Sequence, residues 1–342
     1  MIVVLGYYGF GNLGDEAILA TLCQDLEDLG VSREEIVVLS GNPQHTRGQH
    51  GVQALGRFEM GKLWRTLPSA HCLIAGGGSL FQDVTSKRSI PYYLSIVELA
   101  LLRNVPVFMY AQGVGPVRTK IYQRWVRRAF NKSVAYTVRD EASVRFLKEL
   151  GVPTQLGSLC ADPVFQRQGA KFCSPSSRLL LNLRPYNLWP AQRDLWVDLV
   201  SHWMGEGWQV EFIPLGPGDR GLALDLQVKL PELRVHSTLE LDTVAEVYSG
   251  AGLCVSMRLH GIIFAALYGV FPLGLNYDPK VEAISAQLQI PLWELEELPS
   301  LKLGLGEVVA QREQYEQDCA SALEVLQKLA EGNRTMLAQV LR

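Results

Sequence analysis

Several features that would assign this chain to a special class of protein are absent from it. Its 342 residues carry 32 Lys and Arg against 35 Asp and Glu, and a net charge of −3 gives no overall attraction to nucleic acid. The six cysteines form no Cys-x-x-Cys pair and mostly lie in apolar runs, which is typical of buried thiols in a reducing compartment. The six histidines show no HxxxH or HExxH spacing, so we expect no metal site.

Segments that would cross or enter a membrane are missing as well. No stretch reaches the roughly 18 apolar residues of a spanning helix, and no basic segment precedes the apolar run at 2–5, as a signal peptide would require. We therefore expect a cytoplasmic protein. The segments 101–103 and 123–128 mix basic and apolar side chains, which leaves peripheral membrane contact and an ordinary solvated helix face both open.

What the sequence does contain is a regular alternation of short apolar runs and helical stretches. Uninterrupted hydrophobicity in a run is what a strand buried on both faces requires, so the series predicts βαβ units and a doubly wound parallel sheet. The predicted strands are 2–5, 36–39, 72–75, 107–110 and 135–138, and the predicted helices are 15–29, 90–103, 120–132 and 140–150.

A second series of the same kind follows a polar stretch at 166–178, which has no period and reads as a linker. Its predicted strands are 179–184, 209–214, 234–236, 253–256 and 272–275, and its predicted helices are 192–206, 242–249, 261–268 and 280–288. We therefore expect an α/β fold with two Rossmann-like doubly wound domains facing a cleft. They comprise residues 1–165 and 179–304, and a C-terminal helical segment covers 305–342.

The first candidate functional motif joins the first strand to the first helix and contains Gly9, Gly11 and Asn12. Glycines there let the backbone approach a ligand, and the helix start offers unpaired N–H groups. Asp15 has two interpretations, a cap of that helix or a group that acts on a sugar hydroxyl. The spacing is not GxGxxG and includes no Walker lysine, so neither a dinucleotide nor a P-loop nucleotide is indicated.

The second and third motifs also follow predicted strands, where ligands bind in open α/β sheets. Three consecutive glycines, among them Gly77 and Gly78, favour a close approach of a ligand or of backbone, and Asp83 follows as another candidate base. Arg139 precedes Asp140, which we expect to cap the next helix. Arg139 itself is suited either to a phosphate or carboxylate or to a structural ion pair.

The fourth motif is Arg258-Leu259-His260, directly after an apolar strand. In an extended stretch positions 258 and 260 share a face, so both side chains would reach one ligand, and the pairing favours an oxyanion. Lys280 follows the next strand and either adds a positive charge there or lies exposed in solvent.

Taken together and in this order, the four motifs resemble the polysaccharide pyruvyl transferase family, especially its CsaB-type members. The resemblance runs from the first strand to about Lys280. It implies a fold similar to the GT-B glycosyltransferases, with the acceptor on the first domain and the donor on the second. It also implies phosphoenolpyruvate as donor, with no further cofactor, and as acceptor a sugar of a cell-wall or extracellular polysaccharide precursor. The equivalents of Arg139, Arg258, Leu259 and His260 line the donor site in this family.

The implied reaction forms a pyruvyl ketal and releases phosphate. It needs an acid and a base for the sugar hydroxyl. We assign His260 either as the acid or as the group that polarises the departing phosphate, and Asp15 and Asp83 both remain open as the base. Two other functions fit the same scaffold, a nucleotide-sugar glycosyltransferase and a non-catalytic sugar- or anion-binding module. The sequence shows no recognisable ribose-binding Glu in its second domain. This favours phosphoenolpyruvate, a small dianion, over a nucleotide sugar as the donor.

Overall fold

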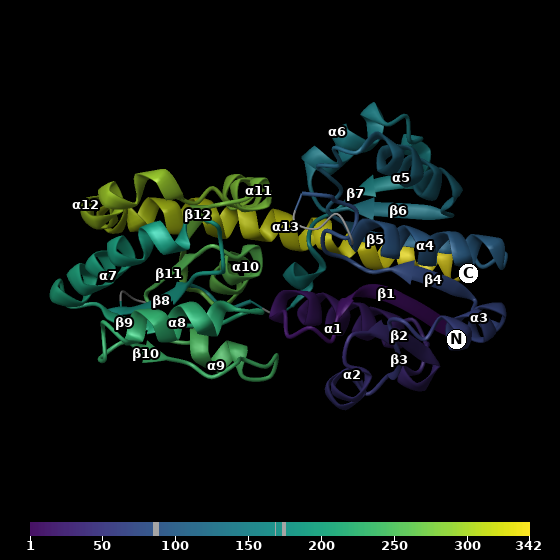
Figure 1. The fold of residues 1–342 in the computed structure, drawn as a ribbon. Coiled ribbons are helices and arrows are strands. Elements are labelled where there is room, and N and C mark those ends of the chain that lie inside the picture. Colours follow the sequence, from purple (N-terminus) through teal and green to yellow (C-terminus); the bar gives the residue numbers. More distant parts are fainter. Residues whose placement is uncertain (85–88, 168, 173–175) are drawn as a thin grey trace. The chain divides into compact units, whose positions relative to one another are not determined.

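The computed structural model describes residues 1–84, 89–167, 169–172 and 176–342. It divides the chain into two compact units, unit 1 (Met1–Gln166 with Leu326–Arg342) and unit 2 (Arg167–Val325). Each unit holds one parallel sheet with helices on both of its faces (Figure 1). The predicted fold class, α/β with two Rossmann-like doubly wound domains, is confirmed.

Unit 1 is built on a seven-stranded sheet in the order β3-β2-β1-β4-β5-β6-β7. The central strands are continuous apolar runs because helices cover both of their faces; Val3 and Val4, neighbours that point to opposite sides, are both fully buried. The strand order reverses between β1 and β4. The strands are β1 (Ile2–Tyr8), β2 (Ile36–Ser40), β3 (Gln53–Gly56), β4 (Cys72–Ala75), β5 (Val107–Gln112), β6 (Ala135–Val138) and β7 (Gly157–Leu159).

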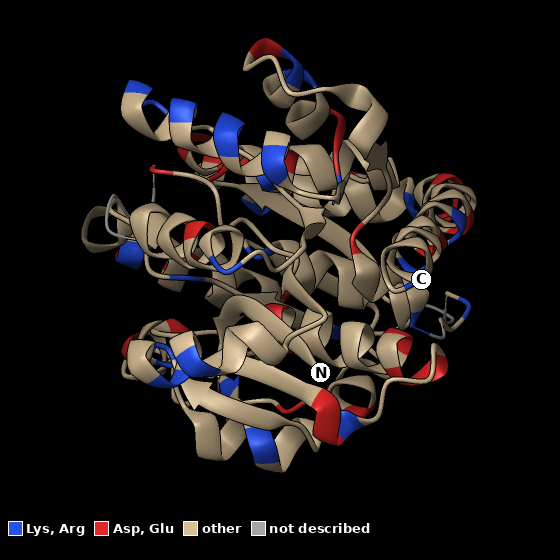
Figure 2. Cartoon of the chain, turned by 90° about the vertical axis from the view of Figure 1, so that its right-hand side faces the viewer, with Lys and Arg blue, Asp and Glu red and all other residues tan. Residues whose placement is uncertain are grey.

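The helices of unit 1 pack on this sheet through amphipathic faces. One core cluster joins Val3 and Leu5 to apolar residues of α4 and α5. The exposed residues of α5 are mostly Lys and Arg (Figure 2). The helices are α1 (Leu13–Asp28), α2 (Pro43–His50), α3 (Met60–Thr66), α4 (Ser89–Leu102), α5 (Lys120–Lys132) and α6 (Glu141–Glu149).

The last helix, α13 (Arg312–Val340), begins in unit 2 and ends in unit 1. Its final turns are held in unit 1 by a hydrogen bond from Asn333 Nδ2 to the carbonyl of Ala161 (2.9 Å) and by an ion pair between Arg334 and Asp28 (3.1 Å). The C-terminal helical segment expected at 305–342 is therefore shared between the two units.

Unit 2 repeats the arrangement with a six-stranded parallel sheet in the order β10-β9-β8-β11-β12-β13. Its order reverses between β8 and β11. The strands are β8 (Arg178–Asn182), β9 (Gln209–Phe212), β10 (Arg234–Val235), β11 (Leu253–Ser256), β12 (Phe271–Asn276) and β13 (Leu292–Glu294). The helices are α7 (Trp189–Gly205), α8 (Asp219–Gln227), α9 (Val244–Tyr248), α10 (Leu259–Leu267), α11 (Pro279–Leu288) and α12 (Leu298–Ala310).

Strands that the apolar pattern did not predict lie at the sheet edges. β3, β7 and β13 are short and only partly buried, so they carry no continuous apolar run. The polar stretch 166–178 is not one free linker throughout: Gln166 ends a short 3₁₀ helix of unit 1, and Arg178 begins β8. Residues 168 and 173–175 within it lie outside the described residues.

Five of the cysteines are described, and all five are buried free thiols. Burial raises the pKa of Cys72 to about 12, so this thiol stays protonated at neutral pH. Cys173 lies outside the described residues. Within the described ranges, no helix is both long and apolar enough to cross a membrane.

Candidate functional site

The predicted site residues lie at the carboxyl edges of the two sheets, and several of them follow the strands between which the strand order reverses. In unit 1 the loops after β1 and β4 flank that point, and in unit 2 the segments after β8 and β11 do so. Such switch points are where open α/β sheets bind ligands, because the connections leave a crevice there. Each unit therefore carries its own set of candidate groups.

The loop after β1 begins α1 two residues earlier than predicted, at Leu13, and Asn12 is its cap. Asn12 Oδ1 accepts from the amide of Gly14 (3.3 Å), and its Nδ2 donates to Asp15. Of the two interpretations of Asp15, the cap is therefore wrong, since Asp15 lies in the first turn. Its carboxyl group is 8% exposed and faces the loop after β4.

Gly9 and Gly11 of this loop differ in the space around them. Gly9 has a φ of +76°, and a Cβ there would lie 2.1 Å from Ser40 Oγ, so its glycine is required by packing against the β2–α2 turn. Gly11 also has a positive φ, +71°, but a Cβ there would meet no atom within 4 Å. The buried Glu16 fixes the loop by accepting from the amide of Gly9 (2.8 Å) and bonding His50 Nε2 (2.9 Å).

The three glycines after β4 make room for side chains of β1 and α1. The ring of Tyr8 is fully buried, and a Cβ on Gly76 would lie 2.1 Å from its hydroxyl oxygen. A Cβ on Gly77 would crowd Ile18, and one on Gly78 would lie 2.9 Å from Asp15 Oδ1. Side chains of β1 and α1 therefore fill the space beside these three glycines, and Gly78 lies next to the Asp15 carboxylate.

Asp83 is an anchor for the chain ahead of α5. Its two carboxylate oxygens accept from the amides of Arg118 and Thr119, each at 2.8 Å. Burial acts to raise the pKa of Asp83, but these hydrogen bonds outweigh it and hold that pKa below its usual range. A carboxylate so occupied is a weak proton acceptor.

Arg139 takes part in a buried ion pair that joins three segments of unit 1. Its Nη1 lies 2.8 Å from Asp162 Oδ2, and its Nη2 donates to Ser79 Oγ (3.1 Å) in the loop after β4. Asp140 caps α6 by accepting from the amide of Ser143 (2.7 Å), as expected. Asp162 was not among the predicted residues, although it follows β7 in the same way that the other site residues follow their strands.

In unit 2 the strongest polar contact joins Arg258 to Asp219 at the start of α8. Arg258 Nε and Nη2 bond the two carboxylate oxygens at 2.7 and 2.5 Å. Asp219 is fully buried and also accepts from the amides of Leu215 and Gly216, each at 3.0 Å. Asp219 was not among the predicted residues, although the Gly-Pro-Gly turn that precedes it after β9 was a usable signal.

The predicted geometry of Arg258-Leu259-His260 is wrong in one respect. Helix α10 begins at Leu259, so Arg258 is the extended residue before it and His260 lies in the first helical turn. The two side chains are therefore not alternate members of one extended face. Directly after β11, the buried hydroxyl of Ser256 accepts a hydrogen bond from the amide of Arg258 (3.0 Å). The side chain of Leu259 is 7% exposed, and the His260 ring lies near Phe264.

A second cationic group lies after β8 and β12. The Arg184 guanidinium is 4.6 Å from the centre of the Tyr277 ring and donates to the Tyr277 hydroxyl at 2.5 Å. Lys280 Nζ is 5.8 Å from the same ring and 3.5 Å from Asp278. Lys280 is thus paired and partly buried rather than fully solvated. Arg184 was not among the predicted residues, although it closes the apolar run at 179–184.

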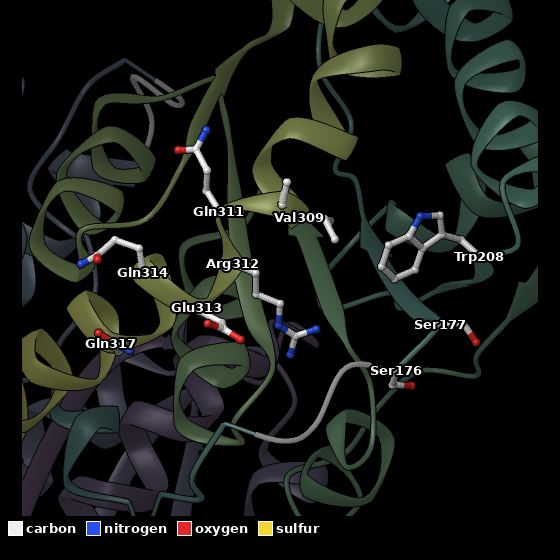
Figure 3. Close-up of a pocket in the computed structure, with 10 residues that line it drawn as sticks. Ser176, Ser177, Trp208, Val309, Gln311, Arg312, Glu313, Gln314 and Gln317 are labelled. Carbon is white, nitrogen blue, oxygen red and sulfur yellow. The ribbon is translucent and has the colours of Figure 1, made fainter.

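We also searched the described part of the chain for metal-ligand groups and for cavities. No group of three or more His, Cys, Asp or Glu able to hold a metal ion occurs there. A cavity of about 660 Å³ in unit 2 is lined by Trp208, Arg312 and neighbouring residues of α13 (Figure 3). It adjoins Ser176 and Ser177, at the amino end of β8, and is therefore at the edge opposite the candidate site.

Comparison with known sequences identifies relatives in polysaccharide synthesis. A sequence model of the polysaccharide pyruvyl transferase family matches residues 12–279. The amylovoran biosynthesis protein AmsJ of Erwinia amylovora is 24% identical over 254 residues, which are 64% of this chain and 60% of AmsJ. The match therefore spans less than two thirds of that relative.

Comparison with solved structures identifies the fold. HepE of Anabaena in complex with UDP and glucose superposes with a TM-score of 0.62 at 12% identity, covering 99% of this chain and 98% of HepE. UDP-GlcNAc 2-epimerase of Neisseria meningitidis bound to UDP-GlcNAc gives a TM-score of 0.68 at 11% identity, covering 99% and 100%. The likeness shows a two-domain, GT-B-like fold and, at these identities, no more than that.

Proposed function

Because the chain belongs to the polysaccharide pyruvyl transferase family, we propose that it transfers the pyruvyl group of phosphoenolpyruvate to a sugar. The acceptor is a sugar of a cell-wall or extracellular polysaccharide precursor, carried on a lipid. The products are a pyruvyl ketal and inorganic phosphate, and no further cofactor takes part. The reaction takes place in the cytoplasm, where phosphoenolpyruvate is made.

The observation that carries the proposal is the cationic edge of unit 2. Arg184, Arg258 and Lys280 follow the neighbouring strands β8, β11 and β12, at the edge where α10 begins. Phosphoenolpyruvate carries a phosphate and a carboxylate, and guanidinium groups and helix N-termini bind both. We assign Leu259 to this site through its backbone N–H, because its side chain is buried.

The bond changes define what the protein must supply. One acceptor hydroxyl adds through its oxygen to the enol-ether carbon of phosphoenolpyruvate while a proton goes to the methylene carbon. A second hydroxyl of the same sugar then displaces phosphate from that carbon, which closes the ketal. Each addition needs a base for a hydroxyl proton, and protonation of the methylene and departure of phosphate need an acid.

We assign the acid to His260 and the base to Asp15. His260 lies in the first turn of α10, beside the donor-binding residues in the sequence. Asp15 is preferred to Asp83 because Asp83 already accepts two amide hydrogen bonds. Arg139 is assigned to the donor by the family resemblance. Its buried pair with Asp162 also holds Ser79 in the loop that contains Gly77 and Gly78.

Phosphorus NMR tests the proposal directly. The protein is incubated with phosphoenolpyruvate and a panel of aryl and lipid-linked glycosides, and release of inorganic phosphate that depends on the glycoside is expected. The His260→Ala variant should lose this release, whereas Lys229→Ala, which changes an exposed lysine elsewhere in unit 2, should retain it. Release of nucleoside diphosphate from a sugar nucleotide would instead identify a glycosyltransferase. Binding of phosphoenolpyruvate without turnover would identify a binding module.

A further inference from the structure

Helix α5 in unit 1 carries a concentration of positive charge that the proposed reaction does not use. The segment 116–139 contains no Asp or Glu in a chain whose net charge is −3. Six exposed basic residues lie in or just before the helix: Arg118, Lys120, Arg124, Arg127, Arg128 and Lys132. We call these six residues the basic stripe. Figure 2 shows its bands along the helix near the top of the view.

The helical period sorts these residues onto one side. Lys120, Arg124 and Arg128 follow one another at intervals of four, so they lie above one another on the outer side of α5. Val126 and Phe130 are fully buried and hold the opposite side against the sheet. The stripe is therefore a continuous exposed face about 20 Å long, at 1.5 Å per residue over the helix.

The charges of the stripe are mostly not neutralised within the protein. Arg128 pairs with Glu98 of α4, with Nε and Oε1 2.8 Å apart. For the other five residues the described ranges contain no ion pair. An exposed face with so much unpaired charge of one sign favours an anionic partner.

Exposed apolar side chains accompany the stripe and decide the kind of partner. Ile121 is 65% exposed and lies on the same side of α5 as Arg128, and Val134, just beyond the helix, is 47% exposed. Duplex nucleic acid offers phosphates but no apolar layer, whereas a membrane with anionic lipids offers both. We propose that the basic stripe of α5, with Ile121, binds the surface of an anionic membrane. This inference does not depend on the proposed reaction.

Vesicle sedimentation with the full chain tests the proposal. Vesicles of phosphatidylcholine mixed with phosphatidylglycerol should bind the protein, vesicles of phosphatidylcholine alone should not, and added salt should weaken the binding. Each basic residue near such a surface strengthens binding roughly five-fold. The triple variant Lys120→Gln, Arg124→Gln, Lys132→Gln should therefore bind about 100-fold more weakly.

A matched variant tests whether the position of the removed charges, and not only their number, decides the binding. Arg65→Gln, Lys229→Gln and Lys328→Gln together remove the same charge from exposed positions outside α5, and this variant should bind as the wild type does. Ile121→Ser keeps every charge and should weaken binding through lost apolar contact. Circular dichroism melting of each variant checks that the fold is retained.

Three results would overturn the proposal. One is a wild-type protein that does not sediment with the anionic vesicles. Another is equal loss of binding in the stripe variant and in the matched variant. The third is binding of duplex DNA, lost with the stripe, without binding of vesicles, which would assign the stripe to nucleic acid.

Discussion

The ion pair between Asp219 and Arg258 gives the sharpest test of how unit 2 is held together. Asp219→Asn removes the negative charge but keeps the size of the side chain and one acceptor oxygen. The new NH₂ group then faces donors, because Asp219 receives hydrogen bonds from Arg258 and from the amides of Leu215 and Gly216. Arg258, only 12% exposed, is left without its counter-charge.

The expected loss of stability follows from that burial. Removing one partner of a buried ion pair costs about 3 to 5 kcal/mol. We expect about 3 kcal/mol, the lower end of that range, because the remaining exposure of Arg258 lets water reach part of the guanidinium. For a urea m-value of about 2 to 3 kcal/mol/M, this lowers the unfolding midpoint by about 1 to 1.5 M.

Tryptophan fluorescence in urea is the suitable assay, because Trp189, Trp196, Trp203, Trp208 and Trp293 all lie in unit 2. Asp194→Asn is the matched control: its side chain is 82% exposed and pairs with the partly exposed Arg193, so the midpoint should not move. The double change Asp219→Asn, Arg258→Gln removes both charges and should recover part of the loss. If Asp219→Asn unfolds at the wild-type midpoint, the pair does not stabilise unit 2 and the reasoning fails.

Three further predictions follow, two on the candidate site residues and one on Asp25 in the interior of unit 1. Arg184→Ala should weaken phosphoenolpyruvate binding in calorimetry by about 1.5 to 3 kcal/mol; an unchanged dissociation constant would remove Arg184 from the site. His260→Ala and Asp15→Asn should each lower kcat by about 10²- to 10⁴-fold, whereas Asp83→Asn should lower stability more than turnover; the reverse pattern would make Asp83 the base. Burial raises the pKa of Asp25 from 3.8 to about 6, so the folded state holds its proton more tightly and stability falls as pH rises from about 4 to about 6. Asp25→Asn should abolish that fall and raise the free energy of unfolding at pH 7 by roughly 3 kcal/mol. A melting temperature at pH 7 equal to that of the wild type would contradict this prediction.

Much of the fold was predictable from the sequence because parallel strands buried on both faces are continuous apolar runs. The runs at 72–75, 135–138 and 253–256 coincide with β4, β6 and β11, and the helix predicted at 120–132 coincides with α5. Each of these strands lies inside its sheet rather than at an edge, where both faces need apolar side chains. The edge strand β3, with Gln53 exposed, was missed for the same reason.

The candidate site was predictable in its positions but not in its contacts. Asp15, Gly77 and Gly78 were each singled out because they follow a strand, and the structure brings them together. The extended geometry expected for Arg258 and His260 was wrong because the hydroxyl of Ser256 bonds the amide of Arg258, and α10 begins at once. No pattern of apolar residues records such a local hydrogen bond.

By itself, the sequence determined the class of fold, the order of the motifs that mark the family, and the sheet edge at which each motif lies. Only the tertiary structure decided which partner each arginine meets: Arg139 meets Asp162, Arg258 meets Asp219, and Arg184 meets Tyr277. The physical reason is the crossover topology. Strands of a parallel sheet are joined through crossover connections, so groups that touch at one edge are 23, 39 and 93 residues apart in the chain.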